Sequence, residues 1–288
     1  MRIGVVVLNY NDWQTTIRNV IHIKTLKDIS CIAIVDNCST DDSVRQLSSL
    51  EDDNTFLFES SHNGGYSAGN NIGLRFLIEE REVDYVIVTN PDIIFHQNFV
   101  DEGAFFLTRD TDLISITGRM KYPSGQYDKH PFLRLPRFGR VLAGFILPID
   151  KLLSAVDSKF VVDDSTEIQY VESLPGCLYM IKSSFIKQIG YFDEGTFLYY
   201  EEAILGKQIM GYGGKCGIMT HVDYVHDHAK SISKNISYVQ INKLYNESGL
   251  YYFKKYCNIN VCQQFLYLFF SWLCIIQYQI LSFIKNRK

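Results

Sequence analysis

Apolar and polar positions in the first third of the chain repeat one pattern, in which an apolar run is followed by a polar turn and then by a helical segment. The apolar runs cover residues 3–8, 31–35, 56–58 and 85–89. The first two are continuous and rich in β-branched residues, which is typical of parallel strands that are covered on both faces. This alternation predicts an α/β fold with a doubly wound, mostly parallel sheet.

Polar residues directly follow three of these runs. Asn9 ends the first run, Asp36 and Asn37 follow the second, and Asn90-Pro91-Asp92 follows the last. Because the binding crevices of open α/β sheets lie at the carboxyl ends of their strands, we expect these side chains at one edge of the sheet. One such coincidence would carry little weight, since loops are polar anyway. Three together indicate a site for a nucleotide-type ligand.

The pattern loosens between residues 116 and 147, where prolines and glycines interrupt it. This stretch is also basic, through Lys121, Lys129, Arg134, Arg137 and Arg140. We interpret it as a mobile loop region near the site. A solvated connector is an equally open alternative.

The last segment differs in composition from the rest of the chain. Residues 265–284 carry no charged side chain, and Lys285, Arg287 and Lys288 follow. Twenty helical residues span about 30 Å, the thickness of a bilayer core. The glutamines and aromatic residues in the segment suit a helix that lies in the membrane interface equally well. A helix packed on the globular body is the third alternative, and the sequence leaves all three open.

Composition supports a folded protein with one sizeable core. The chain has 288 residues, of which 47% are hydrophobic, and Lys+Arg number 28 against 32 Asp+Glu. The formal net charge of −4 gives no basic excess for nucleic acid, so we expect no nucleic-acid partner. Seven scattered cysteines suggest neither a zinc ribbon nor a disulfide framework. Since the first apolar run is too short for a signal peptide, the expected location is cytoplasmic.

The motifs resemble those of glycosyltransferase family 2. The nucleotide side is carried by Leu8-Asn9-Tyr10-Asn11, by Val35-Asp36-Asn37-Cys38-Ser39-Thr40-Asp41, and by residues 63–73, which read Asn-Gly-Gly-Tyr-Ser-Ala-Gly-Asn-Asn-Ile-Gly. Thr89-Asn90-Pro91-Asp92 resembles the metal-binding motif of the family, and residues 190–194 and 197–206 resemble its acceptor-side motif. Each motif alone is weak, but their order and spacing make the resemblance specific. It covers roughly residues 3 to 232.

The resemblance implies a GT-A fold and, in most members, inversion at the anomeric carbon. It divides a domain of residues 1–258 into a nucleotide-sugar-binding half, 1–115, and an acceptor and catalytic half, 116–258. Residues 259–288 then form a C-terminal apolar helix that could associate with a membrane. Similar members, including rhamnosyltransferase-like enzymes, build bacterial capsule, O-antigen and other surface glycans.

The resemblance also assigns donor-binding residues. A carboxylate at the position of Asp36 contacts the base, and a strand-end carboxylate can accept a hydrogen bond from the imide N–H of uracil or thymine. The alternative is that Asp36 caps the following helix. The other residues expected at the nucleotide sugar are Asn9, Asn63, Gly65, Gly69, Asn70, Asn90, Asp92 and Gly176. Glycines there let the backbone approach the ribose or diphosphate, and a small residue at position 176 leaves room for the sugar.

Asp92 and His226 are the expected metal ligands. Mg²⁺ and Mn²⁺ favour carboxylate and phosphate oxygens, and such a cation offsets the charge that leaves with a diphosphate. The family's commoner motif has a second aspartate where this chain has Asn90, so the site depends on one carboxylate. Alternatively, Asn90-Pro91-Asp92 is an ordinary turn and His226 is structural.

Glu202 is the expected catalytic base, and Glu201 is the alternative. Glu202 matches the aspartate that serves as base in the Glu-Asp motif of the family, and Glu201 matches the glutamate before it. Adjacent helical residues point about 100° apart, so both cannot face the same hydroxyl. The chain also departs from the family at Ile204 and Gln208, which replace an aspartate and an arginine. A solvated, acidic helix start is the structural alternative.

Together these observations predict an inverting, metal-dependent glycosyltransferase. The donor would be a UDP- or dTDP-sugar and the acceptor a hydroxyl of a lipid-linked bacterial surface glycan. It would act in the cytoplasm at the inner face of the cell membrane, with peripheral contact through residues 265–284. A catalytically silent GT-A scaffold of a polysaccharide-synthesis complex is the alternative. A nucleotidyltransferase is less consistent, because Asn9-Tyr10-Asn11-Asp12 replaces the Gly-rich, basic signature expected after the first strand.

Overall fold

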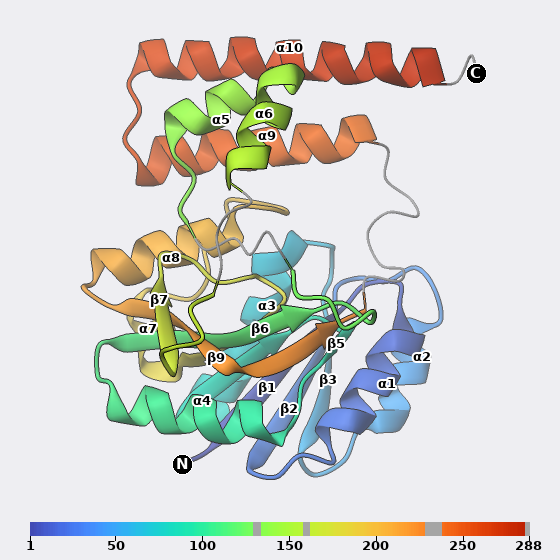
Figure 1. Cartoon of the computed structure of the whole chain (residues 1–288). Coiled ribbons are helices and arrows are strands. Elements are labelled where there is room, and N and C mark those ends of the chain that lie inside the picture. The colour runs from blue at the N-terminus through green and yellow to red at the C-terminus, as the bar shows by residue number, and fades with distance from the viewer. Residues whose placement is uncertain (129–133, 158–161, 228–237, 286–288) are drawn as a thin grey trace.

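The computed structural model describes residues 1–128, 134–157, 162–227 and 238–285 (Figure 1). Its strands are β1 Ile3–Asn9, β2 Ile29–Asp36, β3 Thr55–Glu59, β4 Tyr85–Thr89, β5 Ile93–Ile94, β6 Leu113–Lys121, β7 Ile168–Val171, β8 Leu178–Lys182 and β9 Lys215–His226. Its α-helices are α1 Trp13–Ile23, α2 Ser43–Leu47, α3 Gly65–Arg75, α4 Gln97–Arg109, α5 Phe138–Gly144, α6 Leu147–Asp157, α7 Ser183–Gln188, α8 Glu201–Gly211, α9 Tyr238–Tyr256 and α10 Val261–Lys285. A 3₁₀ turn, η1 Ser48–Leu50, and a π-helical turn, η2 Phe76–Glu80, complete them.

The described strands form one mixed sheet in the order β3-β2-β1-β4-β8-β6-β9-β5, with β7 paired to β9. The first four strands are parallel, as the repeated apolar runs predict. Strand β8 then pairs antiparallel with both β4 and β6. This antiparallel insertion joins the nucleotide-side half of the sheet to the half that carries β6 and β9. The predicted α/β class and GT-A architecture are confirmed.

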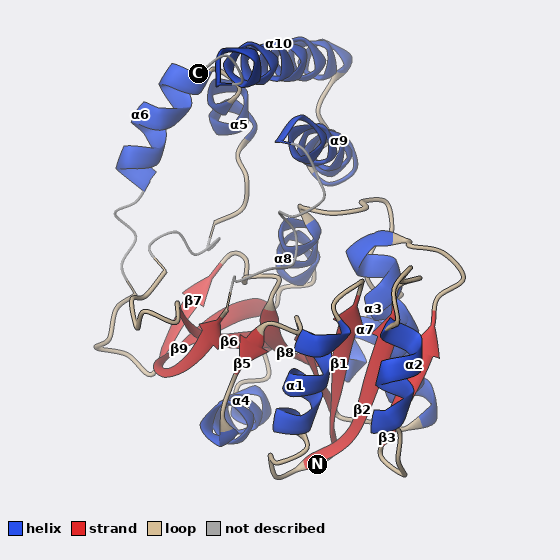
Figure 2. Ribbon diagram, turned by 90° about the vertical axis from the view of Figure 1, so that its right-hand side faces the viewer, coloured by secondary structure: helices blue, strands red, loops and turns tan. Residues whose placement is uncertain are grey.

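Helices cover both faces of the sheet, and each face has its own apolar core (Figure 2). One face packs against α1, α2 and α4, and the other against α3, α7 and α8. Glycines let α3 approach the sheet closely. A Cβ atom on Gly73 would lie 2.9 Å from Val6, and one on Gly69 would lie 2.5 Å from Leu8. Any larger residue at either position would push α3 away from β1.

A group of four helices, α5, α6, α9 and α10, lies on the far side of α8 from the sheet, and we call it the helical cap (Figures 1 and 2). Its core is aromatic: Phe145, Tyr200, Tyr252, Phe253 and Tyr267 are all buried. Tyr200 immediately precedes α8, so this aromatic core attaches the cap to the GT-A body.

The interpretation of residues 116–147 as a loop region is wrong for part of that range. Strand β6 extends to Lys121, and α5 spans Phe138–Gly144 despite its two glycines. The side chains of Phe138, Val141 and Leu142 pack against the aromatic core of the cap. Tertiary burial outweighs the weak helix propensity of the segment here. Residues 129–133, with Lys129, lie outside the described residues.

Helix α10 combines features of two of the three alternatives. Residues Val261–Ile280 are long and apolar enough to cross a membrane by length and composition. One face of the helix nevertheless packs on α9 and α5, and burial of Tyr267 and Cys274 marks that face. The opposite face is exposed.

Candidate active site

The strand-end residues Asn9 and Asp36 hold each other in place. They are paired across β1 and β2, and both are buried. The Asn9 amide donates to Asp36 Oδ1 at 2.7 Å, and Ser39 donates to the same carboxylate through its hydroxyl at 2.6 Å and its backbone N–H at 2.8 Å. Thr16 donates to the other end of the Asn9 amide at 2.7 Å.

Asp36 therefore closes the turn that follows β2. The alternative that it caps the next helix is wrong, because α2 begins at Ser43 and the residue before that helix is Asp42. A carboxylate has room for about four hydrogen bonds, so the internal bonds of Asp36 do not use all of its acceptor capacity. Contact between Asp36 and a nucleotide base stays a prediction.

The Gly-rich turn before α3 is built around Gly65, whose φ of +86° is in the left-handed region. Asn63 accepts hydrogen bonds from the Gly65 backbone at 3.1 Å and from the Asn37 amide at 2.9 Å. The next residue, Tyr66, donates its backbone N–H to the carbonyl of Phe197 at 3.0 Å. Thus the turn connects the end of β2 with the segment that leads to α8.

Replacing Gly65 with alanine is expected to destabilise the protein by about 3 kcal/mol. A Cβ atom there would overlap the carbonyl oxygen of Phe197, and the left-handed backbone adds its own cost for an L-residue. Gly125→Ala is the matched control, because Gly125 has a φ of +81° with no heavy atom within 4 Å of the added Cβ. Urea unfolding should show a loss of only about 1 kcal/mol for the control. Equal losses in the two variants would contradict the steric argument.

Helix α3 also ties the two halves of the molecule together. The Asn71 side chain donates to the carbonyl of Phe192 at 2.9 Å and to Glu194 at 2.8 Å, and it accepts from the Phe192 N–H at 2.9 Å. The neighbouring Asn70 is fully buried and bonds back to the carbonyl of Tyr66 at 2.9 Å. Asn70 and Gly69 therefore lie inside the helix–sheet packing, and contact of either with a ligand stays a prediction.

The Asn-Pro-Asp turn brings Asp92 against His226 at the end of β9. Asp92 Oδ2 lies 3.2 Å from His226 Nε2, and both side chains are nearly buried. The backbone N–H of Asp227 donates to the carbonyl of Asp92 at 2.9 Å, while the other imidazole nitrogen lies 3.3 Å from the sulfur of Met120. The carboxylate of Asp92 and the imidazole of His226, far apart in sequence, are therefore in direct contact. His228 lies outside the described residues.

The Asp92–His226 pair has the chemistry of a divalent-cation site. A carboxylate oxygen and an imidazole nitrogen lie 3.2 Å apart, and both groups are ligand types for divalent cations. Burial lowers the pKa of His226, but its hydrogen bonds with Asp92 and Cys177 outweigh this and raise the pKa to about 10. The imidazole is therefore protonated near neutral pH, and a cation would have to displace that proton to bind the nitrogen. Among the described residues, no three His, Cys, Asp or Glu side chains cluster as a complete metal site. Oxygens of a bound diphosphate would have to complete the coordination shell.

Two consecutive tyrosines in left-handed conformation place the candidate bases at the start of α8. The φ angles are +73° at Tyr199 and +70° at Tyr200, and α8 begins at Glu201. Left-handed residues other than glycine cost about 1–2 kcal/mol each. Burial of Tyr200 in the aromatic core of the helical cap offsets that cost. The Ser173 hydroxyl also donates to the carbonyl of Glu202 at 3.0 Å, so the position of this first turn is fixed from two sides.

The backbone of Gly176 and Cys177 accepts hydrogen bonds from two parts of the site and lies beside the third. The hydroxyl of Tyr66, from the nucleotide-side turn, donates to the carbonyl of Gly176 at 2.5 Å. Asn90, from the Asn-Pro-Asp turn, donates its backbone N–H to the carbonyl of Cys177 at 2.9 Å. A Cβ atom on Gly176 would lie 3.8 Å from Glu202 Oε2. The Gly-rich turn, the Asn-Pro-Asp turn and the Glu202 carboxylate therefore all lie next to the dipeptide Gly176-Cys177.

Both α8 carboxyl groups have raised pKa values. Burial, followed by the negative charge of Glu202, raises the pKa of Glu201 to about 8. Burial also raises the pKa of Glu202. The two charges repel each other, so the second proton lost from the pair is held more tightly than the first. A carboxyl group with a raised pKa is a stronger base than an exposed one, as a proton acceptor in catalysis requires.

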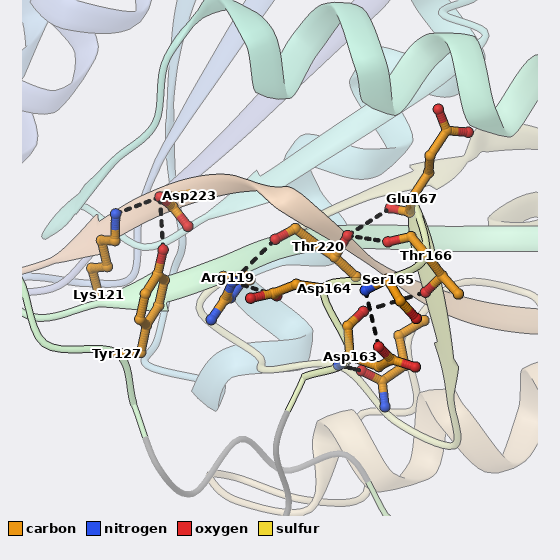
Figure 3. A network of polar contacts seen from close by, with 11 residues as sticks. Arg119, Lys121, Tyr127, Asp163, Asp164, Ser165, Thr166, Glu167, Thr220 and Asp223 are labelled. Atoms are coloured by element: carbon orange, nitrogen blue, oxygen red, sulfur yellow. Dashed lines mark hydrogen bonds and ion pairs between the residues drawn. The ribbon is translucent and has the colours of Figure 1, made fainter.

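A polar network braces the strands that carry Met120 and His226 (Figure 3). Arg119 forms an ion pair with Asp164 at 2.7 Å and lies over the ring of Tyr127, 3.8 Å from its centroid. Lys121 pairs with Asp223 on β9, and Tyr127 donates to the same carboxylate at 3.3 Å. The register of β6 and β9 shifts between Thr117 and Arg119, and this network spans the shifted part. Of the cations in the predicted basic loop, Lys121 lies on β6 and pairs with Asp223, and Arg140 lies on α5 and pairs with Asp150.

The acceptor-side acids Asp193 and Glu194 serve the fold. Asp193 accepts hydrogen bonds from Tyr251 at 2.8 Å, from Lys255 at 2.9 Å and from Tyr256, all on α9. Glu194 accepts the bond from Asn71 described above. These contacts attach α9, and with it the helical cap, to the end of the GT-A motif.

Sequence reasoning missed several residues that shape the site. Tyr66, Asn71 and Cys177 connect the parts of the site, and Ser39 and Thr16 hold the Asn9–Asp36 pair. Tyr66 and Asn71 lie inside the Gly-rich motif of residues 63–73, and this location was the sequence signal that could have identified them. Thr16 lies outside the quoted motifs, although its partner Asn9 is only seven residues away. Cys177 is far in sequence from its partner Asn90.

Solved structures with the same fold are glycosyltransferases. GalNAc-T7, solved with UDP, GalNAc and Mn²⁺, matches with a TM-score of 0.60 and 14% identity, over 86% of this chain and 48% of that one. The mannosyltransferase PcManGT of Pyrobaculum calidifontis, solved with GDP-Man and Mn²⁺, matches with a TM-score of 0.57 and 15% identity, over 100% of this chain and 76% of that one. At this identity the likeness concerns the fold.

Sequence comparisons agree with the fold. The low-salt glycan biosynthesis hexosyltransferase Agl10 of Haloferax volcanii is 28% identical over 200 residues, which cover 69% of this chain and 59% of that protein. The aligned part thus spans less than two thirds of the relative. The family profile described as glycosyl transferase family 2 matches residues 4–155, just over half of the chain. This chain therefore belongs to glycosyl transferase family 2.

Proposed function

We propose that the protein transfers a hexosyl unit, with inversion, from a UDP- or dTDP-sugar to a hydroxyl group of a lipid-linked bacterial surface glycan such as capsule or O-antigen. Rhamnosyltransferase-like enzymes are among the family members that the motifs resemble. The Haloferax relative is a hexosyltransferase of glycan biosynthesis, and the GalNAc-T7 structure holds UDP and Mn²⁺. Both are consistent with a nucleotide-sugar donor and a divalent cation. The proposed location is the cytoplasmic face of the membrane.

The observation that carries the proposal is the convergence on Gly176 and Cys177. Tyr66, Asn90 and Glu202 each contact this dipeptide or lie within 4 Å of a side chain built on it. A nucleotide-side loop, a candidate cation site and a half-buried carboxylate are what a displacement at an anomeric carbon requires in one place. A scaffold without catalysis would not require the half-buried acid pair at the start of α8.

In the proposed reaction, Glu202 removes the proton from the acceptor hydroxyl. The hydroxyl oxygen forms a bond to the anomeric carbon, while the bond from that carbon to the β-phosphate oxygen breaks, so one displacement inverts the configuration. Burial raises the pKa of Glu202, and burial together with the charge of Glu202 raises the pKa of Glu201. Asp92 and His226 would hold a divalent cation, which supplies charge neutralisation at the diphosphate when it is bound. The absence of a bulky side chain at Gly176 leaves space beside Glu202.

A donor panel tests this function. Thermal unfolding is measured with UDP-, dTDP- and GDP-sugars, each with and without Mn²⁺, and the stabilising donor is then incubated with a lipid-linked acceptor. We expect one uracil or thymine donor to raise the unfolding temperature in a Mn²⁺-dependent way, because a ligand that binds only the folded state stabilises it. NMR of the product should show the anomeric configuration opposite to that of the donor.

Retention of configuration would contradict the single displacement. Donor binding with neither transfer nor donor hydrolysis would favour the scaffold alternative. Stabilisation by GDP-sugars alone would overturn the proposed donor base.

A further inference from the structure

The exposed face of α10 is a continuous apolar stripe. Phe265, Leu268, Phe269 and Trp272 follow one another at the spacing of a single helical face, and 50–69% of each of these residues is exposed. We call these four residues the docking stripe. Val261, Leu266 and Ile280, beside it or further along the helix, are also exposed. Adjacent exposed aromatic and aliphatic residues of this number indicate an interaction surface.

The opposite face of α10 is held in the helical cap. Tyr267 is fully buried and donates to the carbonyl of Asn246 on α9 at 3.1 Å. The Gln277 side chain donates to the carbonyl of Phe145 at 2.9 Å and accepts from the N–H of Leu147 at 3.2 Å. These bonds cap the junction between α5 and α6. If α10 crossed a bilayer, it would have to leave all of these partners, so the structure favours a helix that lies flat.

The charge of residues 254–288 indicates which kind of partner would cover the docking stripe. Between residues 254 and 288 the sequence contains five cations and no Asp or Glu, although the whole chain has a net charge of −4. The cations are Lys254, Lys255, Lys285, Arg287 and Lys288. Lys254 and Lys255 lie on α9, where Lys255 is paired with Asp193, and the other three follow the apolar part of α10 in the sequence. A helix with an apolar face and cations near its end matches the interface of a bilayer with anionic headgroups.

We propose that α10 docks the protein flat on an anionic lipid bilayer, with the docking stripe inserted between headgroups and acyl chains and the buried face still attached to the helical cap. The proposal rests on the proposed function, because it places the acceptor side toward the membrane. Helix α8, which carries Glu202, lies between the sheet and the cap (Figure 1). Docking through α10 would therefore turn the helical cap, with the catalytic residues of α8 behind it, toward the membrane on which a lipid-linked acceptor resides.

Flotation and fluorescence test the docking. The full chain is centrifuged with vesicles of phosphatidylcholine alone or mixed with phosphatidylglycerol. Trp272 is observed in a Trp13→Phe background, because the chain has two tryptophans. We expect flotation with the anionic vesicles, a blue shift of the Trp272 emission, and quenching by lipids brominated near the headgroup. The double variant Phe265→Gln/Phe269→Gln should bind at least about tenfold more weakly, the factor that corresponds to 1.4 kcal/mol of lost binding free energy.

The matched control is Phe105→Gln, which removes an exposed phenylalanine from α4 and should float like the wild type. Circular dichroism and thermal unfolding of each variant exclude misfolding as the cause of weak binding. Absence of flotation, or equal flotation of the double variant, would overturn the proposal. A blue shift that grows with protein concentration without vesicles would instead assign the stripe to a second copy of the chain. Quenching only by lipids brominated at the bilayer centre would indicate a spanning helix.

Because flotation requires neither donor nor acceptor, its result is independent of the transferase assignment. Transfer to a water-soluble acceptor by a protein that does not float would reject docking alone. Flotation of a protein that transfers no sugar would reject the proposed function alone.

Discussion

Replacing Glu202 with glutamine is expected to reduce turnover by about a thousandfold while the donor still binds. General base catalysis by a positioned side chain contributes typically 10²–10⁴-fold to a rate, and glutamine keeps the shape of glutamate without its basicity. Glu202 Oε2 lies beside Gly176, at the dipeptide that joins the nucleotide-side turn to the Asn-Pro-Asp turn. Steady-state transfer and donor-induced thermal stabilisation, measured on the same protein, separate the two effects.

Glu201→Gln is the matched control, since it makes the same change one residue earlier in the same helix. We expect a much smaller loss of turnover in this variant, because its effect would act through the charge of the pair. If Glu201→Gln abolished transfer and Glu202→Gln did not, the two roles would be reversed. Loss of donor binding in Glu202→Gln would instead point to a structural role for this carboxylate.

The pH dependence of turnover is a second measure of the same carboxyl pair. The raised pKa values mean that the pair holds a proton at pH values where an ordinary glutamate, with a pKa of about 4.3, is ionised. A base must be deprotonated, so turnover should rise with pH above the range in which an ordinary glutamate ionises. Because burial is the cause that raises the pKa of Glu202, Glu201→Gln should leave the acidic limb close to its position in the wild type. A limb that moves far in Glu201→Gln would show that it reports the ionisation of Glu201.

The sheet and its ligand-binding edge were predictable because they depend on local pattern. Continuous apolar runs followed by polar residues placed Asn9, Asp36 and Asn90 at strand ends, and the structure has them there. The antiparallel strand β8 between β4 and β6 was not predictable in the same way. Its position depends on pairing with strands distant in sequence, which a periodic pattern does not encode.

The convergence of the site needed the family resemblance, because no local rule relates Asp92 to His226 or Tyr66 to Gly176. The same limit explains the internal partners of Asp36. From sequence alone, an aspartate at a strand end is equally consistent with a helix cap and with a residue that binds the nucleotide base. Only the folded structure shows that Asn9 and Ser39 donate hydrogen bonds to it.

In the C-terminal helix α10, the sequence does not show which face is buried. Tyr267 and Phe269 have similar side chains and lie two residues apart, yet Tyr267 is fully buried and Phe269 is 53% exposed. Composition could not separate these faces, since both are apolar. The partner helices α9 and α5 decide which face is covered.

Replacing Asp92 with asparagine is expected to lower kcat/KM by about 10²–10³-fold and to remove Mn²⁺-dependent binding of the donor. Asparagine keeps the size of the side chain but loses the only carboxylate of the Asn-Pro-Asp turn, and a metal ion supplies several kcal/mol of charge stabilisation in such reactions. Binding is measured without turnover, by the decrease in the electron paramagnetic resonance signal of free Mn²⁺ when UDP and protein are added. This readout does not depend on the identity of the sugar or of the acceptor.

Asp112→Asn is the control, because Asp112 is exposed and pairs with Lys215 away from the site. Asp92→Asn also breaks the close contact with His226, so thermal unfolding must be measured alongside. A stably folded Asp92→Asn protein that binds Mn²⁺ and UDP like the wild type would exclude Asp92 as a ligand. In His226→Gln, an intermediate loss of Mn²⁺ binding is expected, because the carboxylate remains. The order of the two losses then distinguishes a cation held mainly by the acid from one held mainly by the imidazole.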